Sequence, residues 1–308
     1  DYFTHQPNLI LVLTGTSSKL ETKDKHWFYQ NWINPVSETH KSAVTEKVVK
    51  LIAKADAVAA PPLKNLYPFQ SAGVAFLKQV GGRAILADEM GLGKTVQALT
   101  YARLLGDGVR RMVIVAPASV TYKWKNECVT WLTKEWDAEV VEKTKGDLPK
   151  ARVLIMSYAV ATSRYQQIIK WHPDMLIMDE AHALKGEKSQ RARAFKQYSI
   201  DVPYILCLSA SPFLNRPQEL WNILHVLDPL TWNKAWDFYV RYCGMKQNYF
   251  GWEATGATNT EELAQRLKTV MVRRLKKDVL QQLPALTRVI LPVKIQMKEY
   301  RAARKDRP

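Results

Sequence analysis

Ala-Asp-Glu-Met-Gly-Leu-Gly-Lys-Thr occupies residues 87–95, between an apolar run at residues 84–87 and a helix-like segment at residues 96–105. An apolar strand, a glycine-rich turn, Lys-Thr and a helix together form the arrangement that a phosphate-binding loop requires. Gly91 and Gly93 allow the backbone to turn with its N–H groups pointing inward. Those N–H groups and the N-terminus of the helix predict an anion-binding site at this turn.

Lys94 and Thr95 supply the chemistry that such a loop needs. The lysine is placed to reach the β- and γ-phosphates of a nucleotide, and the threonine hydroxyl can ligate Mg²⁺. The strict motif has a glycine where this chain has Asp88, so the loop alone is moderately specific. The candidate nucleotide-binding residues of the loop are Asp88, Glu89, Met90, Gly91, Leu92, Gly93, Lys94 and Thr95.

A second motif at residues 175–182, Met-Leu-Ile-Met-Asp-Glu-Ala-His, predicts a buried strand that ends in two carboxylates. A nucleoside triphosphatase needs one carboxylate to hold Mg²⁺ and another to orient the attacking water. Asp179 fits the first role and Glu180 the second, so Lys94, Asp179 and Glu180 are the candidate catalytic residues and Thr95 and Asp179 the candidate metal ligands. The ordinary alternatives are a glycine turn and an acidic strand end. The order, strand context and chemistry of the two motifs favour the nucleotide site.

The charge of the chain indicates a polyanionic partner. The 308 residues, enough for one large or two smaller domains, include 45 basic and 29 acidic residues, a net charge of +16. DNA or RNA is the leading candidate, and a basic protein without a nucleic-acid role is the alternative. Charge alone does not separate the two, whereas the nucleotide motifs favour nucleic acid. The sequence has no run of 18 apolar residues and no signal-peptide pattern, so we expect no membrane span.

The cysteines and histidines predict no structural metal site and no disulfide framework. Cys128, Cys207 and Cys243 are widely spaced, and the six histidines form no paired-ligand pattern. The simplest interpretation is a reducing intracellular compartment, either cytoplasm or nucleus. The metal that we expect is therefore the one that accompanies the nucleotide.

An alternation of strands and helices over residues 61–227 predicts an α/β domain with a central parallel sheet. Residues 1–60 differ in character, and Pro61-Pro62 separates them as an N-terminal extension or small accessory domain. The first four expected strands each end in a turn that carries functional residues, at the edge where open α/β sheets bind ligands. The expected strands are residues 83–87, 112–116, 153–157, 175–179 and 204–209, and the expected helices are residues 70–80, 95–105, 120–132, 189–197 and 218–227.

Residues 228–286 break this alternation and are rich in tryptophan and tyrosine. A Gly-Thr-Asn-rich turn at residues 251–260 precedes a helical pattern at residues 261–280, with Leu263 and Leu267 in its apolar stripe. The segment is predicted to be a mostly helical insertion that completes the sheet domain. Residues 287–308 begin with a strand-like run and end in a charged tail.

Taken together, the motifs resemble the first RecA-like lobe of superfamily-2 DEAH-type ATPases, in the Swi/Snf-like DNA translocase branch. The resemblance covers residues 61–308 and implies an α/β, RecA-like P-loop NTPase lobe. Gly81-Gly82-Arg83 and Arg241-Tyr242-Cys243 are most similar to the annealing-helicase (HARP-like) group. The motifs that carry the resemblance lie at residues 66–70, 87–95, 113–117, 179–182, 208–212 and 272–279.

The resemblance implies further nucleotide contacts. Gln70 stands where the family's glutamine recognises adenine through its amide, and the alternative is an ordinary glutamine at a helix N-terminus. Arg83 would either help to bind the nucleotide or help to stabilise the fold, and the alternative is an exposed arginine without either role. Asp88 and Glu89 belong to the family's DEMGLGKT form of the loop, which explains the missing glycine.

The resemblance also implies contacts to the DNA backbone after the second strand. Ser119, Thr121, Lys123 and Lys125 supply donors for phosphates, and the alternative is that Ser119 caps the following helix. Trp124 is expected to pack in the core rather than stack on a base. The pair at residues 157–158 is expected to be another DNA contact at a strand end.

Ser209, Ala210 and Ser211 align with the motif that couples the nucleotide state to the grip on DNA. The family commonly has Gly-Thr where Ala210-Ser211 stands, and the added methyl group restricts the backbone. The alternative is a polar turn after a buried strand. A later basic cluster, Arg273, Arg274, Lys276 and Lys277, is predicted to be either a solvated helix face or a contact to DNA or a second lobe.

We therefore expect the ATP-binding lobe of a Mg²⁺-dependent, DNA-dependent ATPase that translocates on or remodels double-stranded DNA. The family closes its nucleotide site with arginine fingers from a second RecA-like lobe, and residues 287–308 would begin the connection to that lobe. This lobe alone is expected to bind ATP and Mg²⁺ but to hydrolyse ATP weakly. The alternatives are a strand-separating DNA or RNA helicase and a non-catalytic nucleotide- and nucleic-acid-binding scaffold. The sequence leaves the oligomeric state open.

Overall fold

The computed structural model describes residues 66–184, 189–211, 217–249 and 251–280. The expectations for residues 1–60 and 287–308 lie outside these ranges. Within them, none of the helices is long and apolar enough to cross a membrane.

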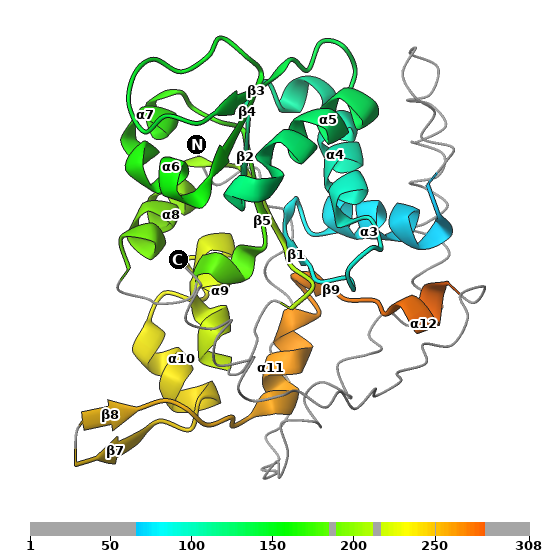
Figure 1. The fold of residues 1–308 in the computed structure, drawn as a ribbon. Coiled ribbons are helices and arrows are strands. Elements are labelled where there is room, and N and C mark those ends of the chain that lie inside the picture. The colour runs from blue at the N-terminus through cyan, green and yellow to red at the C-terminus, as the bar shows by residue number, and fades with distance from the viewer. Residues whose placement is uncertain (1–65, 185–188, 212–216, 250, 281–308) are drawn as a thin grey trace, which may run out of the picture.

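A parallel sheet forms the centre of the protein (Figure 1). Its 7 strands lie in the order β3-β4-β2-β5-β6-β1-β9. The central parallel sheet predicted from the sequence is confirmed, and five strands fall where they were expected, to within one residue. The strands are β1 (Arg83–Leu86), β2 (Met112–Ala116), β3 (Ala138–Val141), β4 (Val153–Ser157), β5 (Met175–Asp179), β6 (Tyr204–Leu208) and β9 (Met271–Val272).

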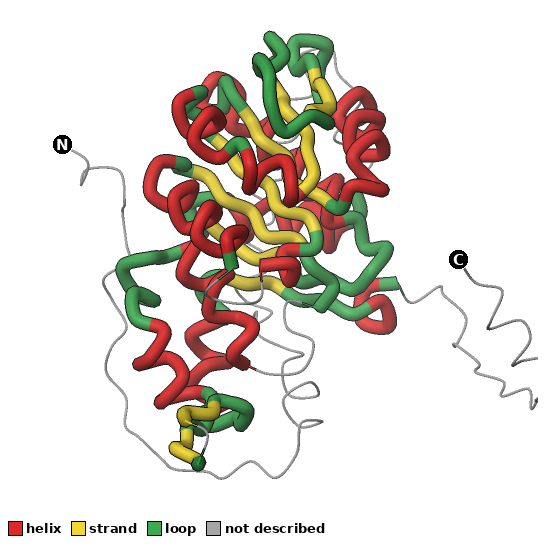
Figure 2. The backbone as a smooth tube through the Cα atoms, turned by 60° about the vertical axis from the view of Figure 1, so that its left-hand side comes forward, coloured by secondary structure: helices red, strands yellow, loops and turns green. Residues whose placement is uncertain are grey.

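Helices cover both faces of the sheet (Figures 1 and 2). One face carries α3 (Pro68–Gln79), α4 (Lys94–Leu105) and α5 (Thr121–Trp131). The other carries α6 (Tyr158–Ser163), α7 (Tyr165–Lys170), α8 (Gln190–Asp201), α9 (Trp221–Leu227), α10 (Ala235–Tyr242) and α11 (Thr260–Leu267). Alternate residues of a strand enter opposite cores: Ile114 packs with the first set of helices, and Val113 and Val115 pack with the second. Because both faces are buried, the strands read as continuous apolar runs.

Short 3₁₀ helices connect several of these elements. They are η3 (Gly106–Gly108), η4 (Ala118–Val120), η5 (Ala181–Leu184) and η6 (Pro217–Leu220). Helix starts follow the sequence: Pro68 and a reciprocal cap between Tyr67 and Gln70 begin α3, and the Ser189 hydroxyl accepts a hydrogen bond from Ala192 N at the start of α8. These caps fix where each helix leaves the edge of the sheet.

The predicted helix at residues 261–280 is wrong. The chain forms α11 only to Leu267, then strand β9, and then the short helix α12 (Lys276–Val279). The β-branched residues Thr269, Val270 and Val272 favour extended backbone, and β1 offers a strand edge to pair with. A helical apolar stripe and a short strand are indistinguishable by periodicity alone in so brief a segment.

The sequence analysis also missed strand β3, the helices α6, α7 and α10, and an antiparallel hairpin. The hairpin consists of β7 (Lys246–Asn248) and β8 (Gly251–Glu253) and extends away from the sheet at the lower left of Figure 1. The rings of Trp236 on α10 and Trp252 on β8 meet edge to face, with centroids 5.0 Å apart. All of these elements are short, so local pattern gave little signal for them.

Candidate nucleotide-binding site

The site lies at the carboxyl edge of the sheet, after strands β5, β6 and β1. These three strands are neighbours in the sheet and run parallel, so the segments that follow them emerge side by side. The segment after β1 is the glycine-rich loop, the segment after β5 begins with Asp179 and Glu180, and the segment after β6 is the turn at residues 209–211. The structure thus brings both sequence motifs to one edge.

The loop has the backbone conformation that its glycines predict. Gly91 and Gly93 have φ of 86° and 74°, and Gly93 is the residue immediately before α4. A Cβ atom on Gly93 would lie 2.4 Å from the amide nitrogen of Gln70, so a side chain there would force the Gln70 amide to move. Thr95 is half-buried in the first turn of α4. The loop and the helix N-terminus therefore present the anion-binding arrangement predicted from the sequence.

Lys94 is half-buried, and its Nζ donates a hydrogen bond to the carbonyl oxygen of Asp88 over 2.8 Å. Burial lowers its pKa from the ordinary value. The negative charges of Asp88, Glu180 and Asp179 oppose that shift, whereas the positive charge of Arg273 adds to it. Lys94 therefore lies close enough to the acidic pair for their charges to act on its pKa.

The side chain of Asp88 contacts other protein groups and stabilises the loop. Its carboxylate is fully buried, forms an ion pair with Arg274 and accepts a hydrogen bond of 3.0 Å from Gln97 Nε2. Arg274 Nε donates to the other carboxylate oxygen over 2.9 Å, and a further guanidinium nitrogen donates to the Phe69 carbonyl. A buried charge must be paired in this way. The aspartate that replaces the usual glycine thus anchors the loop to α3, α4 and the segment after β9.

The remaining loop candidates have different environments. Glu89 accepts a hydrogen bond of 2.7 Å from the backbone N–H of Lys276, at the start of α12. Leu92 is fully buried, whereas Met90 is 70% exposed. The carboxylate of Glu89 is therefore also engaged by the segment after β9.

Gln70 is held close to the loop by both ends of its amide. Its Oε1 accepts from the N–H of Tyr67 over 3.1 Å, and its Nε2 donates to the carbonyl of Leu92 over 3.3 Å. Recognition of adenine by Gln70 would require these hydrogen bonds to be exchanged. The structure thus gives the amide a helix-capping and loop-anchoring role, and the adenine role stays a prediction.

Asp179 is oriented by groups that the sequence analysis assigned elsewhere. The indole N–H of Trp124 donates to its Oδ2 over 2.9 Å, the N–H of Glu180 donates to its Oδ1 over 3.0 Å, and the Tyr158 hydroxyl donates to its carbonyl over 2.8 Å. Trp124 is 2% exposed, so its predicted core packing is confirmed. Of the pair at residues 157–158, Tyr158 is buried and the half-buried Ser157 accepts a hydrogen bond from Val160 N, and the DNA contact expected there stays a prediction. The order of residues in the sequence could not reveal the contacts that α5 and α6 make with the end of β5.

Glu180 lies in a small polar cluster with His182 and Ser209. Its backbone has φ of 50°, in the left-handed region. His182 Nδ1 lies 3.1 Å from Glu180 Oε2 and 3.2 Å from Ser209 Oγ, and the Ser209 hydroxyl lies 3.5 Å from Glu180 Oε2. Ser209 is fully buried and also accepts from Ser211 N over 3.3 Å. The proposed coupling turn is therefore in contact with the proposed water-orienting carboxylate.

The candidate DNA contacts after β2 fall into two groups. Ser119 and Lys123 are exposed. Thr121 is buried and its hydroxyl donates to the Ala118 carbonyl over 3.1 Å, whereas Lys125 forms an ion pair of 2.9 Å with Glu139. The alternative role for Ser119 as a cap is wrong, because Val120 precedes α5 and no side chain caps it.

Arg83 lies at the opposite, amino edge of the sheet and holds the fold. Its guanidinium donates to the carbonyl oxygens of Leu227, Val202, Ser199 and Val226, at 2.6, 2.6, 2.9 and 2.9 Å, and burial lowers its pKa.

The basic cluster at residues 273–277 is not a solvated face of a long helix. Arg273 and Arg274 instead point into the loop region, where both donate to protein acceptors.

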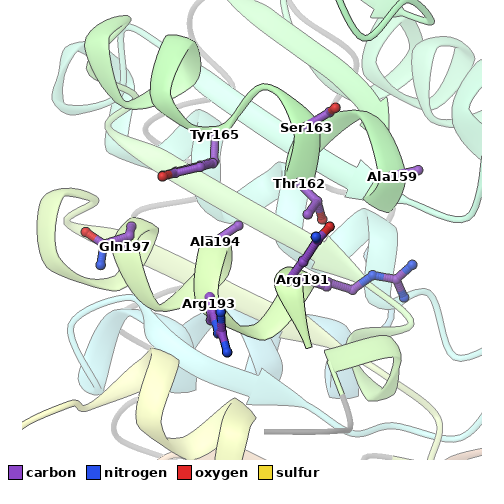
Figure 3. Close-up of a pocket in the computed structure, with 9 residues that line it drawn as sticks. Ala159, Thr162, Ser163, Tyr165, Arg191, Arg193, Ala194 and Gln197 are labelled. Carbon is purple, nitrogen blue, oxygen red and sulfur yellow. The ribbon is translucent and has the colours of Figure 1, made fainter. Parts of the chain in front are cut away.

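A pocket of about 620 Å³ lies between α6, α7 and α8, away from the glycine-rich loop (Figure 3). Figure 3 shows Arg191 and Arg193 on α8, below Thr162 and Ser163 at the end of α6. None of the lining residues is acidic; they are Ala159, Thr162, Ser163, Tyr165, Gln190, Arg191, Arg193, Ala194 and Gln197. Helix α6 follows β4 directly, and α8 lies between β5 and β6 in the chain.

The donor set fits a magnesium ion carried by a nucleotide. Among the described residues, no three His, Cys, Asp or Glu side chains gather in a way that could hold a metal. Thr95 and Asp179 offer a hydroxyl and a carboxylate, which are hard oxygen ligands. Mg²⁺ typically takes one or two such groups together with phosphate oxygens and water.

Comparison with known proteins finds a family profile and several similar proteins. Residues 22–304 match the family profile described as "SNF2-related domain". The chain is 38% identical over 236 residues to the Caenorhabditis elegans protein "SWI/SNF-related matrix-associated actin-dependent regulator of chromatin subfamily A-like protein 1 homolog", which covers 75% of this chain and 34% of that protein. It is 33% identical over 240 residues to "DNA annealing helicase and endonuclease ZRANB3" of Mus musculus, covering 74% of this chain and 22% of that protein.

A solved structure shares the fold. The "Sulfolobus solfataricus SWI2/SNF2 ATPase core in complex with dsDNA" superposes with a TM-score of 0.60 and 24% sequence identity. The match covers 71% of this chain and 47% of the Sulfolobus chain. The chain thus spans about a third or less of the two curated relatives and about half of the solved structure.

Proposed function

Because the chain belongs to the SNF2-related domain family, we propose that it is the ATP-binding lobe of a DNA-dependent ATPase that translocates on or remodels duplex DNA. The observation that carries the proposal is the placement of Lys94, Asp179 and Glu180 at one edge of the sheet, where the two carboxylates act on the pKa of the lysine. A phosphate-binding cation and an acidic pair that face each other are what triphosphate hydrolysis requires.

Each residue has a defined part in this proposal. The ammonium of Lys94 and the N–H groups of the glycine-rich loop bind the phosphates. Thr95 and Asp179 would hold Mg²⁺, which neutralises negative charge on the phosphates when bound. Glu180 orients the attacking water and accepts its proton. Trp124 keeps the carboxylate of Asp179 in place through the hydrogen bond from its indole.

Duplex DNA is the proposed nucleic-acid partner, bound along the carboxyl edge. The net charge of +16 supports a polyanion, and the exposed Ser119 and Lys123 supply donors near that edge. Arg191 and Arg193 add positive charge in the pocket beside α6. A second RecA-like lobe would complete the site with arginine fingers.

We also propose a reducing compartment, cytoplasm or nucleus, which agrees with the buried, free thiols of all three cysteines.

The test is ATP turnover by the intact protein with double-stranded DNA, single-stranded DNA or RNA. The expected result is Mg²⁺-dependent turnover that double-stranded DNA stimulates most, and loss of that turnover in Lys94→Ala. Stimulation by RNA alone would favour a strand-separating RNA helicase. Absence of turnover together with retained ATP binding would favour a non-catalytic scaffold.

A further inference from the structure

The glycine-rich loop and the coupling turn share one hydrogen-bond donor. Arg273 Nη1 donates to the carbonyl oxygen of Ala87 over 3.1 Å and to that of Ala210 over 2.7 Å. Ala87 is the last residue before the loop, and Ala210 is the central residue of the turn. A charged donor bound to two carbonyl groups resists their separation more than a neutral donor does.

A backbone ladder fixes the position of Arg273. The N–H groups of Ile85, Ala87 and Glu89 donate in turn to the carbonyl oxygens of Val270, Val272 and Arg274, at 2.8, 2.8 and 2.9 Å. The parallel pairing of β1 with β9 therefore continues into the first residues of the loop. Because side chains alternate along extended backbone, Arg273 and Arg274 leave this segment in opposite directions.

The two arginines have separate targets. Arg274 contacts Asp88, Gln97 and the Phe69 carbonyl, all of which belong to the loop or to the helices beside it. Arg273 is the one whose donor reaches the turn after β6, and its positive charge helps to lower the pKa of Lys94. Arg274 thus shapes the loop, whereas Arg273 spans from the loop to the turn.

We infer that Arg273 is a positioning residue that couples the glycine-rich loop to the turn at residues 209–211, and through Ser209 to Glu180. A shift of the loop on nucleotide binding then moves the Ala210 carbonyl and changes how the Ser209 hydroxyl meets the Glu180 carboxylate, now 3.5 Å away. The inference rests on the proposed ATPase function. It assigns to an arginine outside the nucleotide motifs a role in the hydrolytic step rather than in nucleotide binding.

The test compares nucleotide binding with turnover in the intact, DNA-saturated protein. Arg273→Ala should lower kcat by about tenfold or more and change the dissociation constant for a non-hydrolysable ATP analogue by less than about threefold. Arg273→Lys, which keeps a charged donor, should recover part of kcat. Arg110→Ala is the matched control, because Arg110 is exposed beside the amino end of β2. If Arg273→Ala does not fold, as judged by its thermal transition, Arg273→Gln takes its place.

A double-mutant cycle with Ser209→Ala distinguishes coupling from independent damage. Coupling predicts that the double variant loses little more kcat than the worse single variant. Multiplicative losses, or a kcat for Arg273→Ala within about twofold of Arg110→Ala, would overturn the inference. Lys94→Ala separates the two proposals. If Lys94→Ala keeps DNA-stimulated turnover, the ATPase assignment itself is wrong. If Lys94→Ala loses turnover while Arg273→Ala keeps a normal kcat, only the coupling inference is wrong.

Discussion

The two edges of the sheet use the same residue types in opposite ways. At the amino edge, Arg83 is surrounded by backbone carbonyls, and the Asp174 carboxylate accepts from the N–H groups of Arg110 and Arg111 at 2.8 and 2.9 Å. At the carboxyl edge, Lys94 and Glu180 are half-buried, and the negative charge of Glu180 opposes the lowering of the lysine's pKa by burial. The amino edge binds these charged groups with its own backbone, whereas the carboxyl edge also pairs charged side chains with one another, as in Asp88 and Arg274.

The difference shows why charge near a motif is a poor guide to function. Arg83 precedes the glycine-rich loop by only a few residues, yet the length of β1 separates them. Arg273 is distant in sequence and contacts the residue before the loop directly. Strand direction, rather than sequence distance, decides which charges reach the site.

The largest expected effect is loss of catalysis without loss of stability at the carboxyl edge. Glu180→Gln should lower kcat by about 10²-fold or more, because the amide cannot accept the proton of the attacking water. Its thermal transition should stay close to that of the unchanged protein, since the residue is half-exposed. Steady-state ATP turnover measures this effect, with the exposed Glu135→Gln as the control. A kcat within twofold of normal would remove Glu180 from the site.

The opposite result is expected at the amino edge. Arg83→Met should lower the free energy of unfolding by about 3 kcal/mol, because several carbonyl oxygens lose a charged donor. The KM for ATP should be unchanged in the folded protein. Urea denaturation measures the loss, and Arg110→Ala, near the same edge but exposed, should stay within about 0.5 kcal/mol. A changed KM at normal stability would place Arg83 in the nucleotide site after all.

A smaller effect on kcat is expected when the hydrogen bond from Trp124 to Asp179 is removed. Trp124→Phe keeps the aromatic ring but removes the indole donor to Asp179 Oδ2. We expect kcat to fall about tenfold and the Mg²⁺ concentration for half-maximal turnover to rise, as for other residues that orient a metal ligand. Titration of Mg²⁺ in the turnover assay measures both. Trp136→Phe, which removes a buried indole stacked on Arg152, is the control and should leave Mg²⁺ dependence unchanged.

The smallest expected effect is an early alkaline loss of nucleotide affinity. Lys94 attracts phosphate only when protonated, and burial lowers its pKa in the nucleotide-free protein. Affinity should therefore begin to fall at a lower pH than it would for an ordinary lysine, by up to about tenfold per pH unit above the shifted pKa. Equilibrium binding of ATP at increasing pH measures the fall. In Lys94→Arg, whose guanidinium stays charged, affinity should be nearly independent of pH over the same range.

Most of the fold was predictable because its signals are local. The five central strands are buried on both faces, so each is an unbroken apolar run bounded by turn residues. Strand β3 was missed because Ala138–Val141 is short and half-exposed. The segment after Leu267 was misassigned because pairing with β1, rather than local propensity, decides its conformation. The family resemblance drawn from the motifs is confirmed by the match to the SNF2-related domain.

The site itself was predictable in its members but not in their contacts. The glycine-rich loop and the acidic pair each carry their own pattern, so Lys94, Thr95, Asp179 and Glu180 could be named from the sequence, and their roles stay predictions. Trp124 gave no such signal, because a tryptophan on an amphipathic helix usually packs in the core. Its hydrogen bond to Asp179 exists only because α5 packs against β2 and thereby reaches the end of β5.

The sequence by itself determined the parallel sheet, through the alternation of strands and helices over residues 61–227, and the phosphate-binding loop and the carboxylates that would work with it, each through one short local motif. Tertiary structure alone decided that Asp88 pairs with Arg274, that Arg273 joins the loop to the coupling turn, and that Arg83 stays on the far edge. Those contacts join residues between 63 and 186 positions apart. Strand order and direction set them, because they decide which segments emerge side by side at one edge of the sheet.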